Sequence, residues 1–358
     1  MWPRPLQSRK RGKQALPKRS GSCRKTIILS LVANPFPESA DAVTGLHFLA
    51  IEIGGTKLQL CAGDGTGRIL DRRRFAVDRE RGAEGIRAQI VEALGELIAR
   101  WQPAAIGVGY GGPVDWRTGR IWRSYHIQGW SDFPLGEWLH EQTRVPVFVD
   151  NDTNIAAFGE ARCGAGKGSD PVFYTNMGSG VGGGLVVNGS IYHGARPGEM
   201  EFGHLRLHGP ERILEDDCSG WSLDCAIRLA VESAPDSVLA QLCAEERGGE
   251  ARHLGPALAA GDALAKSILT TLAGHLTKGL GVVTQLLHPE VIVLGGGVSL
   301  IGEPLRAVVA ARLPDFVMDV FRPGPQVRLA ALREDSVPVG ALLLAAERLA
   351  ILNPAPQS

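Results

Sequence analysis

Apolar and polar residues alternate along most of the chain in a pattern that predicts an α/β protein. From residue 46 onward, three short strands at 47–53, 57–62 and 68–75 are separated by glycine-rich turns. The next segment, "AEGIRAQIVEALGELIARW", has apolar residues at helical spacing. This order predicts strands and helices that alternate along the chain.

The same alternation continues to the C-terminus. Buried strands are expected in "AAIGVGYGG", "VPVFVDND", "PVFYTNM", "VGGGLVV" and "EVIVLGGG", and helices in "TNIAAFGEARCG", 222–232, 254–285 and "VGALLLAAERLA". Glycine turns between strands at 54–55 and 178–184 suggest two similar lobes, each with one phosphate-facing hairpin.

The composition is that of a soluble globular protein. The 358 residues suffice for two compact lobes, and the net charge of zero argues against a protein built to hold nucleic acid. No apolar run reaches the roughly 18 residues that a membrane helix needs. The six cysteines form no C-x-x-C pair, which is typical of reduced thiols in a cytoplasmic protein.

Residues 1–45 differ from the rest of the chain. The first 30 contain nine Lys or Arg and no acid, which predicts a disordered basic tail. A signal peptide would need a longer apolar stretch and a better cleavage site. A DNA-binding helix-turn-helix would need periodic helices, and this proline-containing segment shows none.

Two glycine turns carry candidate phosphate chemistry. In "IEIGGTK", the acid Glu52 and the cation Lys57 flank Gly54, Gly55 and Thr56, which is more than a tight turn requires. In "TNMGSGVGGG", the spacing G-x-G-x-x-G satisfies the dinucleotide fingerprint, but a strand follows it rather than a helix, so a Rossmann site is rejected. A glycine hairpin can still surround phosphate oxygens with backbone N–H groups.

Polar residues gather at one strand-to-helix junction and at one loop. Asp150, Asn151 and Asp152 follow a buried strand; helix capping needs only one of them, so a carboxylate is left that could accept a proton. Glu201 and His204 lie in "GEMEFGHLRL", either as an ordinary exposed loop or as hydrogen-bonding partners of sugar hydroxyls.

Together these motifs resemble the ROK family of sugar kinases and sugar-responsive repressors, over about residues 47–350. The resemblance implies a two-lobed, actin-like or hexokinase-type ATPase fold with ATP and sugar in the cleft between the lobes. The implied parts are a small lobe at 46–150, a large lobe at 151–336 and a helix at 337–352 that packs back on the small lobe.

The resemblance also implies a role for individual residues. Asp152 would be the catalytic base, and the sugar would contact Gly112, Asn151, Glu201 and His204. The nucleotide and its phosphates would lie against Glu52, Gly54, Gly55, Thr56, Lys57, Gly178, Gly180, Gly295, Gly296 and Gly297.

Three positions depart from the family pattern. Glu52 stands where the first motif usually has Asp, and His126 in "SYHIQGW" replaces an asparagine near the sugar. The zinc motif C-x-C-G-x-x-G-C-x-E is broken in "EDDCSGWSLDCAIR", so neither a structural zinc nor any other protein metal site is expected. Asp224 is expected to replace the glutamate of that motif as a sugar contact.

The sequence therefore predicts an ATP- and Mg²⁺-dependent hexose kinase, glucokinase-like, with glucose favoured and fructose or an N-acetylated amino sugar as alternatives. A cytoplasmic homodimer without nucleic-acid or membrane partners is expected. The competing hypotheses are a sugar-responsive transcriptional regulator and a sugar-binding protein without turnover.

Overall fold

The computed structural model describes residues 45–353 with some gaps. The gaps are Thr56, Arg79, Tyr125, His126, Pro197, Glu199, His208 and residues 245–247. The expected basic tail therefore lies outside the described residues apart from Gly45, and the expected roles of Thr56 and His126 lie outside them too.

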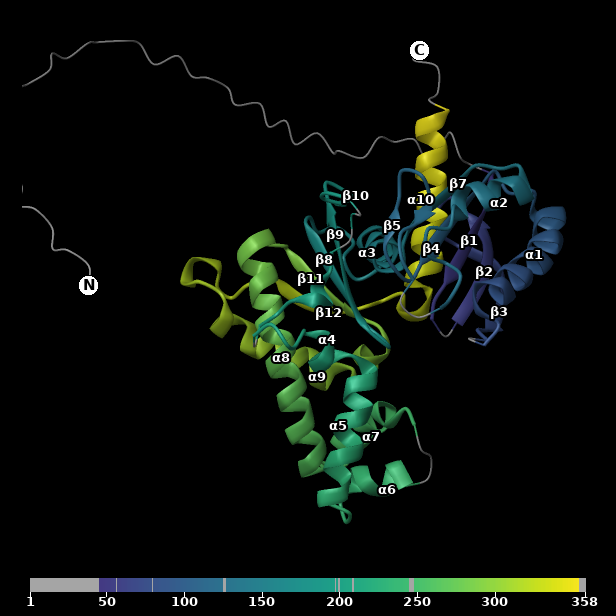
Figure 1. The fold of residues 1–358 in the computed structure, drawn as a ribbon. Coiled ribbons are helices and arrows are strands. Elements are labelled where there is room, and N and C mark those ends of the chain that lie inside the picture. Colours follow the sequence, from purple (N-terminus) through teal and green to yellow (C-terminus); the bar gives the residue numbers. More distant parts are fainter. Residues whose placement is uncertain are drawn as a thin grey trace, which may run out of the picture. The chain divides into compact units, whose positions relative to one another are not determined.

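The first sheet has five strands in the order β3-β2-β1-β4-β7 (Figure 1). They are β1 (His47–Ile53), β2 (Lys57–Asp64), β3 (Ile69–Ala76), β4 (Ala105–Tyr110) and β7 (Val147–Asn151). β1, β2 and β3 pair antiparallel, whereas β4 and β7 continue the sheet in parallel with β1. A small hairpin of β5 (Val114–Asp115) and β6 (Arg120–Ile121) follows β4.

The second sheet repeats this arrangement in the order β10-β9-β8-β11-β12. Its strands are β8 (Val172–Met177), β9 (Val181–Val187), β10 (Ser190–Ile191), β11 (Val291–Gly295) and β12 (Gln326–Leu329). Again the first three strands are antiparallel and the last two are parallel. The two glycine turns thus occupy equivalent places, between β1 and β2 and between β8 and β9.

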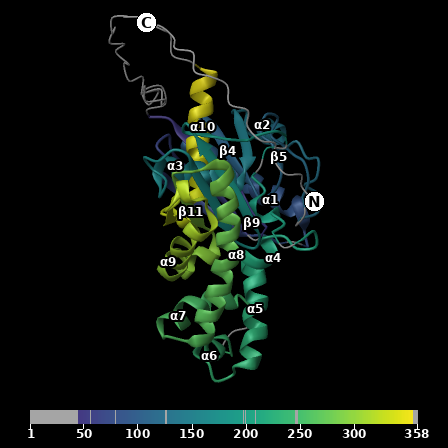
Figure 2. The same cartoon turned by 90° about the vertical axis from the view of Figure 1, so that its left-hand side faces the viewer.

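Helices surround both sheets. The α-helices are α1 (Gly82–Trp101), α2 (Leu135–Thr143), α3 (Asp152–Cys163), α4 (Glu215–Cys218), α5 (Gly220–Ser233), α6 (Val238–Ala244), α7 (Leu254–Ala259), α8 (Ala263–Leu287), α9 (Glu303–Arg312) and α10 (Ser336–Leu352). Short 3-10 segments are η2 (Phe202–His204), η3 (Glu250–His253), η4 (Gly297–Ile301), η5 (Leu313–Phe316), η6 (Asp319–Phe321) and η7 (Arg333–Asp335). α5 packs beside the long α8 (Figure 2).

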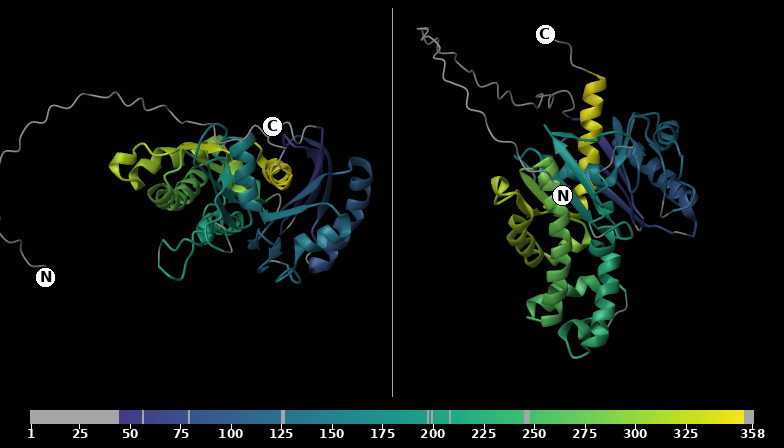
Figure 3. Two further views of the ribbon diagram at one scale, coloured as in Figure 1. Left: turned by 90° about the horizontal axis from the view of Figure 1, so that it is seen from above. Right: turned by 60° about the vertical axis from the view of Figure 1, so that its left-hand side comes forward.

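The helix pair α3 and α10 joins the two sheets. α10 packs on β1 and β4 of the first sheet, α3 packs on β8 and β9 of the second, and the helices contact each other (Figure 3). Glycines permit this close approach: a Cβ on Gly107 of β4 would lie 2.0 Å from the Ala341 carbonyl oxygen. A Cβ on Gly340 would likewise lie 2.0 Å from the carbonyl oxygen of Ile155.

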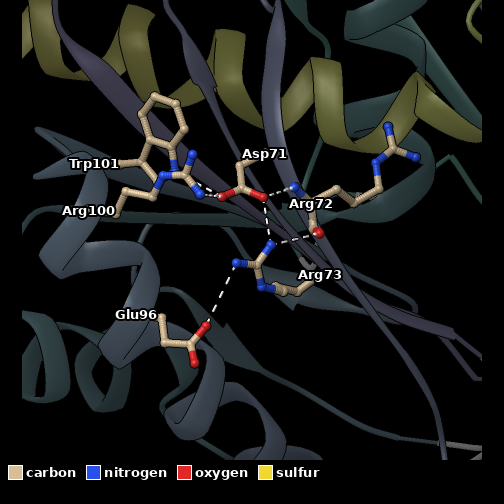
Figure 4. A network of polar contacts seen from close by, with 6 residues as sticks. All are labelled: Asp71, Arg72, Arg73, Glu96, Arg100 and Trp101. Carbon is tan, nitrogen blue, oxygen red and sulfur yellow. Dashed lines mark hydrogen bonds and ion pairs between the residues drawn. The ribbon is translucent and has the colours of Figure 1, made fainter.

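A polar network fastens α1 to the edge strand β3 (Figure 4). The Asp71 carboxylate accepts hydrogen bonds from Arg73, from the Trp101 indole at 3.2 Å and from Arg100 at 3.2 Å. Burial opposes ionisation of Asp71, but these donors outweigh it and lower its pKa. The C-terminal turn of α1 is therefore held by charge as well as by its apolar face.

The structure corrects some sequence expectations. The single helical stretch expected at 254–285 is two helices, because Gly261 adopts φ +81° and Asp262 starts α8 by accepting the Ala265 N–H at 2.7 Å. α2, α6 and β12 were not expected. Among the described residues no helix combines the length and apolarity needed to cross a membrane.

We expect Gly340→Ala to lower the free energy of unfolding by about 3 kcal/mol, because the new methyl group would overlap the Ile155 carbonyl. Gly95→Ala is the matched control, since Gly95 lies within α1 with open space where its Cβ would be. That substitution should leave stability unchanged or raise it slightly. Urea unfolding of both variants measures the difference, and equal stabilities would contradict the packing described.

Candidate active site

The junction of β7 and α3 presents Asp152 at the start of the helix. Asn151 is the helix cap: its side-chain oxygen accepts the N–H groups of Thr153 at 2.9 Å and Asn154 at 3.1 Å. Its amide nitrogen donates to the Gly112 carbonyl at 3.2 Å. Because Asn151 supplies the cap, Asp152 is not needed for it.

The Asp152 carboxyl group has an unusual environment. Burial and, to a smaller extent, the nearby charge of Glu52 raise its pKa to about 7, against the opposite effects of a hydrogen bond from Thr153 and the charge of Lys57. The residue is half-buried rather than sealed from solvent. A carboxyl group of this pKa can both accept and release a proton near neutral pH.

The first glycine hairpin brings an ion pair close to Asp152. Lys57 Nζ lies 3.1 Å from Glu52 Oε1, and the buried Gln59 donates to Glu52 Oε2. Gly54 uses its own N–H to close the turn on the Lys57 carbonyl at 2.9 Å. The acid and the cation expected at the phosphates therefore neutralise each other here.

Backbone contacts place this hairpin against Asp152. The Gly111 N–H donates to the Ile53 carbonyl at 2.9 Å. A Cβ on Gly111 would lie 3.3 Å from Asp152 Oδ2 and 3.7 Å from the Gly54 Cα. Gly54 and Asp152 therefore both lie beside Gly111.

The second hairpin approaches from the other sheet. A Cβ on Gly182 would lie 2.6 Å from Thr153 Oγ1, so β9 touches the residue after Asp152. Gly178 closes its turn by donating to the Gly180 carbonyl at 2.9 Å. Within the described part of the chain, the N–H groups of Ser179 and Gly180 donate to no protein acceptor. These two amides are free to bind an anion.

Glu215 also lies at this turn, which the sequence did not indicate. Its carboxylate accepts the Val181 N–H at 2.7 Å, and a Cβ on Gly180 would lie 2.6 Å from the same oxygen. No motif marks Glu215 because it reaches the turn from α4, 34 residues further along the chain.

His204 Nδ1 lies 3.1 Å from Glu201 Oε2, and both side chains are exposed. Their segment packs on β9: a Cβ on Gly203 would lie 2.1 Å from the Val181 carbonyl oxygen, and Met200 bridges to Gly183. The backbone of this segment therefore lies beside the second hairpin.

A pocket of about 560 Å³ begins at the second hairpin. It is lined by Gly178, Ser179, Gly220, Trp221, Asp224, Gly249, Ala251, Arg252, Gly255, Pro256, Gly297, Val298, Leu300 and Ile301. The lining is mostly apolar, with one carboxylate and one guanidinium group. Its size and character suit a planar base with a ribose.

Two groups singled out in the sequence lie at this pocket. Asp224 lines it together with Gly178, and its carboxylate accepts the Ala251 N–H at 2.7 Å. Of Gly295, which ends β11, and the following Gly296 and Gly297, only Gly297 lines the pocket. A Cβ on Gly295 would overlap Tyr174, and one on Gly296 would overlap Met177, so both glycines are closely packed.

Asp150 makes a contact that the sequence did not reveal. His193 Nε2 lies 2.6 Å from Asp150 Oδ2, both side chains are buried, and the His193 ring stacks on Trp116 at 4.4 Å. Asp150 Oδ1 accepts the Asn151 N–H at 2.8 Å. His193 follows β10 of the second sheet, so this contact links that sheet to the start of α3.

Among the described residues no group of three or more His, Cys, Asp or Glu side chains is arranged to hold a metal ion. Glu52 and Asp152 are the carboxylates that the first hairpin brings together. Two carboxylates fit Mg²⁺, which usually keeps several waters and takes its other ligands from substrate phosphates.

Comparison with known proteins identifies the family. The model of the ROK family matches residues 48–348. The chain belongs to the ROK family. It is 31% identical to a glucokinase of Halalkalibacterium halodurans over 310 residues, which cover 82% of this chain and 93% of that protein.

Solved structures of ROK proteins share the fold. The ROK family glucokinase from Streptomyces griseus in complex with glucose and AMPPNP is 30% identical, with a TM-score of 0.75 over 84% of this chain and 99% of that one. A ROK family transcriptional regulator, a homologue of the E. coli MLC protein, has the same TM-score at 21% identity, over 86% of this chain and 79% of that one. The expected two-lobed actin-like fold is confirmed.

The environment of Asp152 generates a prediction about its titration. In the free protein, carboxyl ¹³C NMR should show Asp152 titrating at about pH 7. Glu52→Gln removes a negative charge that raises the pKa, so the midpoint should move down. The signal should be missing in Asp152→Asn, which assigns it. A midpoint near 3.8 in both the wild type and Glu52→Gln would contradict this account.

Proposed function

We propose that this chain is an ATP-dependent hexose kinase of the glucokinase type. The observation that carries the proposal is the Asp152 carboxyl group, with its pKa raised to about 7, beside the first glycine hairpin and next to Thr153, which β9 of the second hairpin contacts. Glucose is the favoured sugar because the related proteins include the H. halodurans glucokinase and the S. griseus glucokinase bound to glucose. Fructose and N-acetylated amino sugars are the alternatives.

The proposed reaction needs one proton acceptor and a place for the phosphates. Asp152 takes the proton of a sugar hydroxyl while that oxygen forms a bond to the γ-phosphorus of ATP. The bond from the γ-phosphorus to the bridging oxygen breaks, and ADP leaves with that oxygen. Sugar phosphate and protonated Asp152 remain, and the proton passes to solvent.

The phosphates lie between the two hairpins in this proposal. The free N–H groups of Ser179 and Gly180 bind phosphate oxygens from one side, and Lys57 approaches from the other. When bound, Mg²⁺ neutralises charge on the β- and γ-phosphates. Glu52 would hold it, directly or through water. Lys57 and Glu52 separate in the complex, because each then has a partner of its own.

In this proposal the sugar and the nucleoside bind to different sets of residues. We assign the sugar to Glu201, His204, Asn151 and Gly112, which lie on segments next to Asp152 or the second hairpin. We assign the nucleoside to the 560 Å³ pocket with Asp224 and Gly297.

A sugar-responsive regulator is the second candidate, because a ROK family regulator has the same fold. An assay of ADP release distinguishes the kinase from the regulator, since a regulator would bind sugar without releasing ADP. Cytoplasmic location, a homodimer and the absence of a nucleic-acid partner remain predictions from the sequence.

Asp152→Asn should lower kcat by about 10²–10⁴-fold while the Kd for the sugar changes little, because the amide cannot accept the hydroxyl proton. A coupled assay of ADP release over a panel of hexoses, with calorimetry for sugar binding, measures both quantities. The exposed Asp236→Asn is the control and should match the wild type. Undiminished kcat in Asp152→Asn on every sugar that the wild type uses would exclude Asp152 as the base.

Asp224→Asn and Glu201→Gln should affect different substrates. We expect Asp224→Asn to raise the KM for ATP about tenfold and leave the KM for the sugar unchanged, since hydrogen bonds to charged groups are among the stronger ones. Glu201→Gln should raise the KM for the sugar and leave the KM for ATP unchanged. Steady-state kinetics with each substrate varied in turn is the measurement, and an increase in the sugar KM alone for Asp224→Asn would restore its assignment to the sugar.

A further inference from the structure

A second pocket, of about 210 Å³, lies at the edge of the first sheet. Its walls are the β5–β6 hairpin, the edge strand β7 and the C-terminal half of α10. The lining residues are Trp116, Arg117, Phe148, Val149, Asp150, Leu344, Arg348, Ile351 and Leu352. The four α10 residues are spaced i, i+4, i+7 and i+8 and so share one face of the helix.

Two guanidinium groups converge on one indole in this pocket. The Cζ atom of Arg117 lies 4.4 Å from the centre of the Trp116 ring, and that of Arg348 lies 4.9 Å from it. Within the described residues neither guanidinium group makes a hydrogen bond or an ion pair with the protein. The neighbouring acid Glu347 is paired with Arg162 at 3.2 Å.

Trp116 itself offers another donor. Its Nε1 atom is buried and has no hydrogen-bond partner among the described residues. Buried polar groups in folded proteins nearly always have a partner, so this unpaired one calls for an acceptor beyond the described residues.

The one acid in the lining does not supply that acceptor. Both oxygens of Asp150 are engaged, Oδ2 with His193 at 2.6 Å and Oδ1 with the Asn151 N–H at 2.8 Å. The donors of the pocket therefore outnumber its available acceptors.

We propose that this pocket binds a small organic anion, whose carboxylate or phosphate group is held by Arg117 and Arg348. Guanidinium groups match the planar or tetrahedral oxygens of such anions with paired N–H donors. The carbon part of the ligand packs on Phe148 and Leu344. The volume lies below the roughly 300 Å³ of typical sites for drug-sized ligands, which excludes a nucleotide.

The proposal does not depend on the proposed function, because binding is measured without turnover. The site nevertheless adjoins the start of α3: Trp116 stacks on His193, and His193 contacts Asp150.

Isothermal titration calorimetry with the full chain tests the proposal. The probes are inorganic phosphate and benzoate, which distinguish a phosphate from a carboxylate, and benzamide is the neutral match of benzoate. At least one anion should bind the wild type, and benzamide should not. Arg117→Gln and Arg348→Gln should each weaken that binding about tenfold or more. The control is Arg144→Gln, which removes the same charge from an exposed residue outside the pocket.

Trp116→Phe adds a second test, since it keeps an aromatic ring for the arginines but replaces the larger indole by a phenyl ring that has no N–H. It should weaken the same binding several-fold while thermal unfolding stays near that of the wild type. Failure of both anions to bind the wild type would overturn the proposal. Equal affinities in the wild type, Arg117→Gln and Arg348→Gln would also overturn it, because any binding would then lie elsewhere.

Discussion

The contact between α3 and α10 is the constraint on which the rest of the structure depends. α10 packs on the first sheet and α3 mainly on the second, so the contact between the helices joins the two sheets. That contact is made by backbone against backbone, because Gly340 leaves no side chain between α10 and the Ile155 carbonyl. Interiors packed at this density do not tolerate an extra methyl group.

The position of Asp152 at the start of α3 determines the pKa of its carboxyl group. As the first residue of α3 it lies where a helix dipole favours negative charge, by about 0.3–1 kcal/mol at exposed sites. Since one pKa unit equals about 1.4 kcal/mol, the dipole alone would lower the pKa by less than 1. Burial between the hairpins and the charge of Glu52 act the other way and prevail, which gives a pKa of about 7.

Much of the fold followed from local signals. The strands of both glycine hairpins were predicted within about two residues, because alternating apolar positions and glycine turns are local properties. The break at Gly261 was missed, since apolar residues continue at helical spacing on both sides of it. β12 was missed because its four residues form a strand only by pairing with β11.

Site residues could be predicted from the sequence where they stand in short contiguous motifs. They could not be predicted where the fold brings distant segments of the chain together. Asp152, Glu52 and Lys57 stand in short motifs, and the structure brings them together. Asp224 was assigned to the sugar by matching a broken motif, and only the structure places it in the lining of the pocket beside Gly178. Contacts such as Glu215 with Val181 and His193 with Asp150 join residues more than 30 positions apart, and no sequence pattern marks them.

The position of α10 at the end of the chain has a consequence for synthesis on the ribosome. Phe48 and Ala50 of the first strand share a core with Ala341 and Leu342 of the last helix. Nearly three hundred residues separate them. At typical rates of elongation, roughly 15–60 s therefore pass between the synthesis of β1 and that of α10, which covers the first sheet. During that time its apolar face is exposed to other nascent chains. The apolar face that α10 covers is therefore buried only after the last helix has been made.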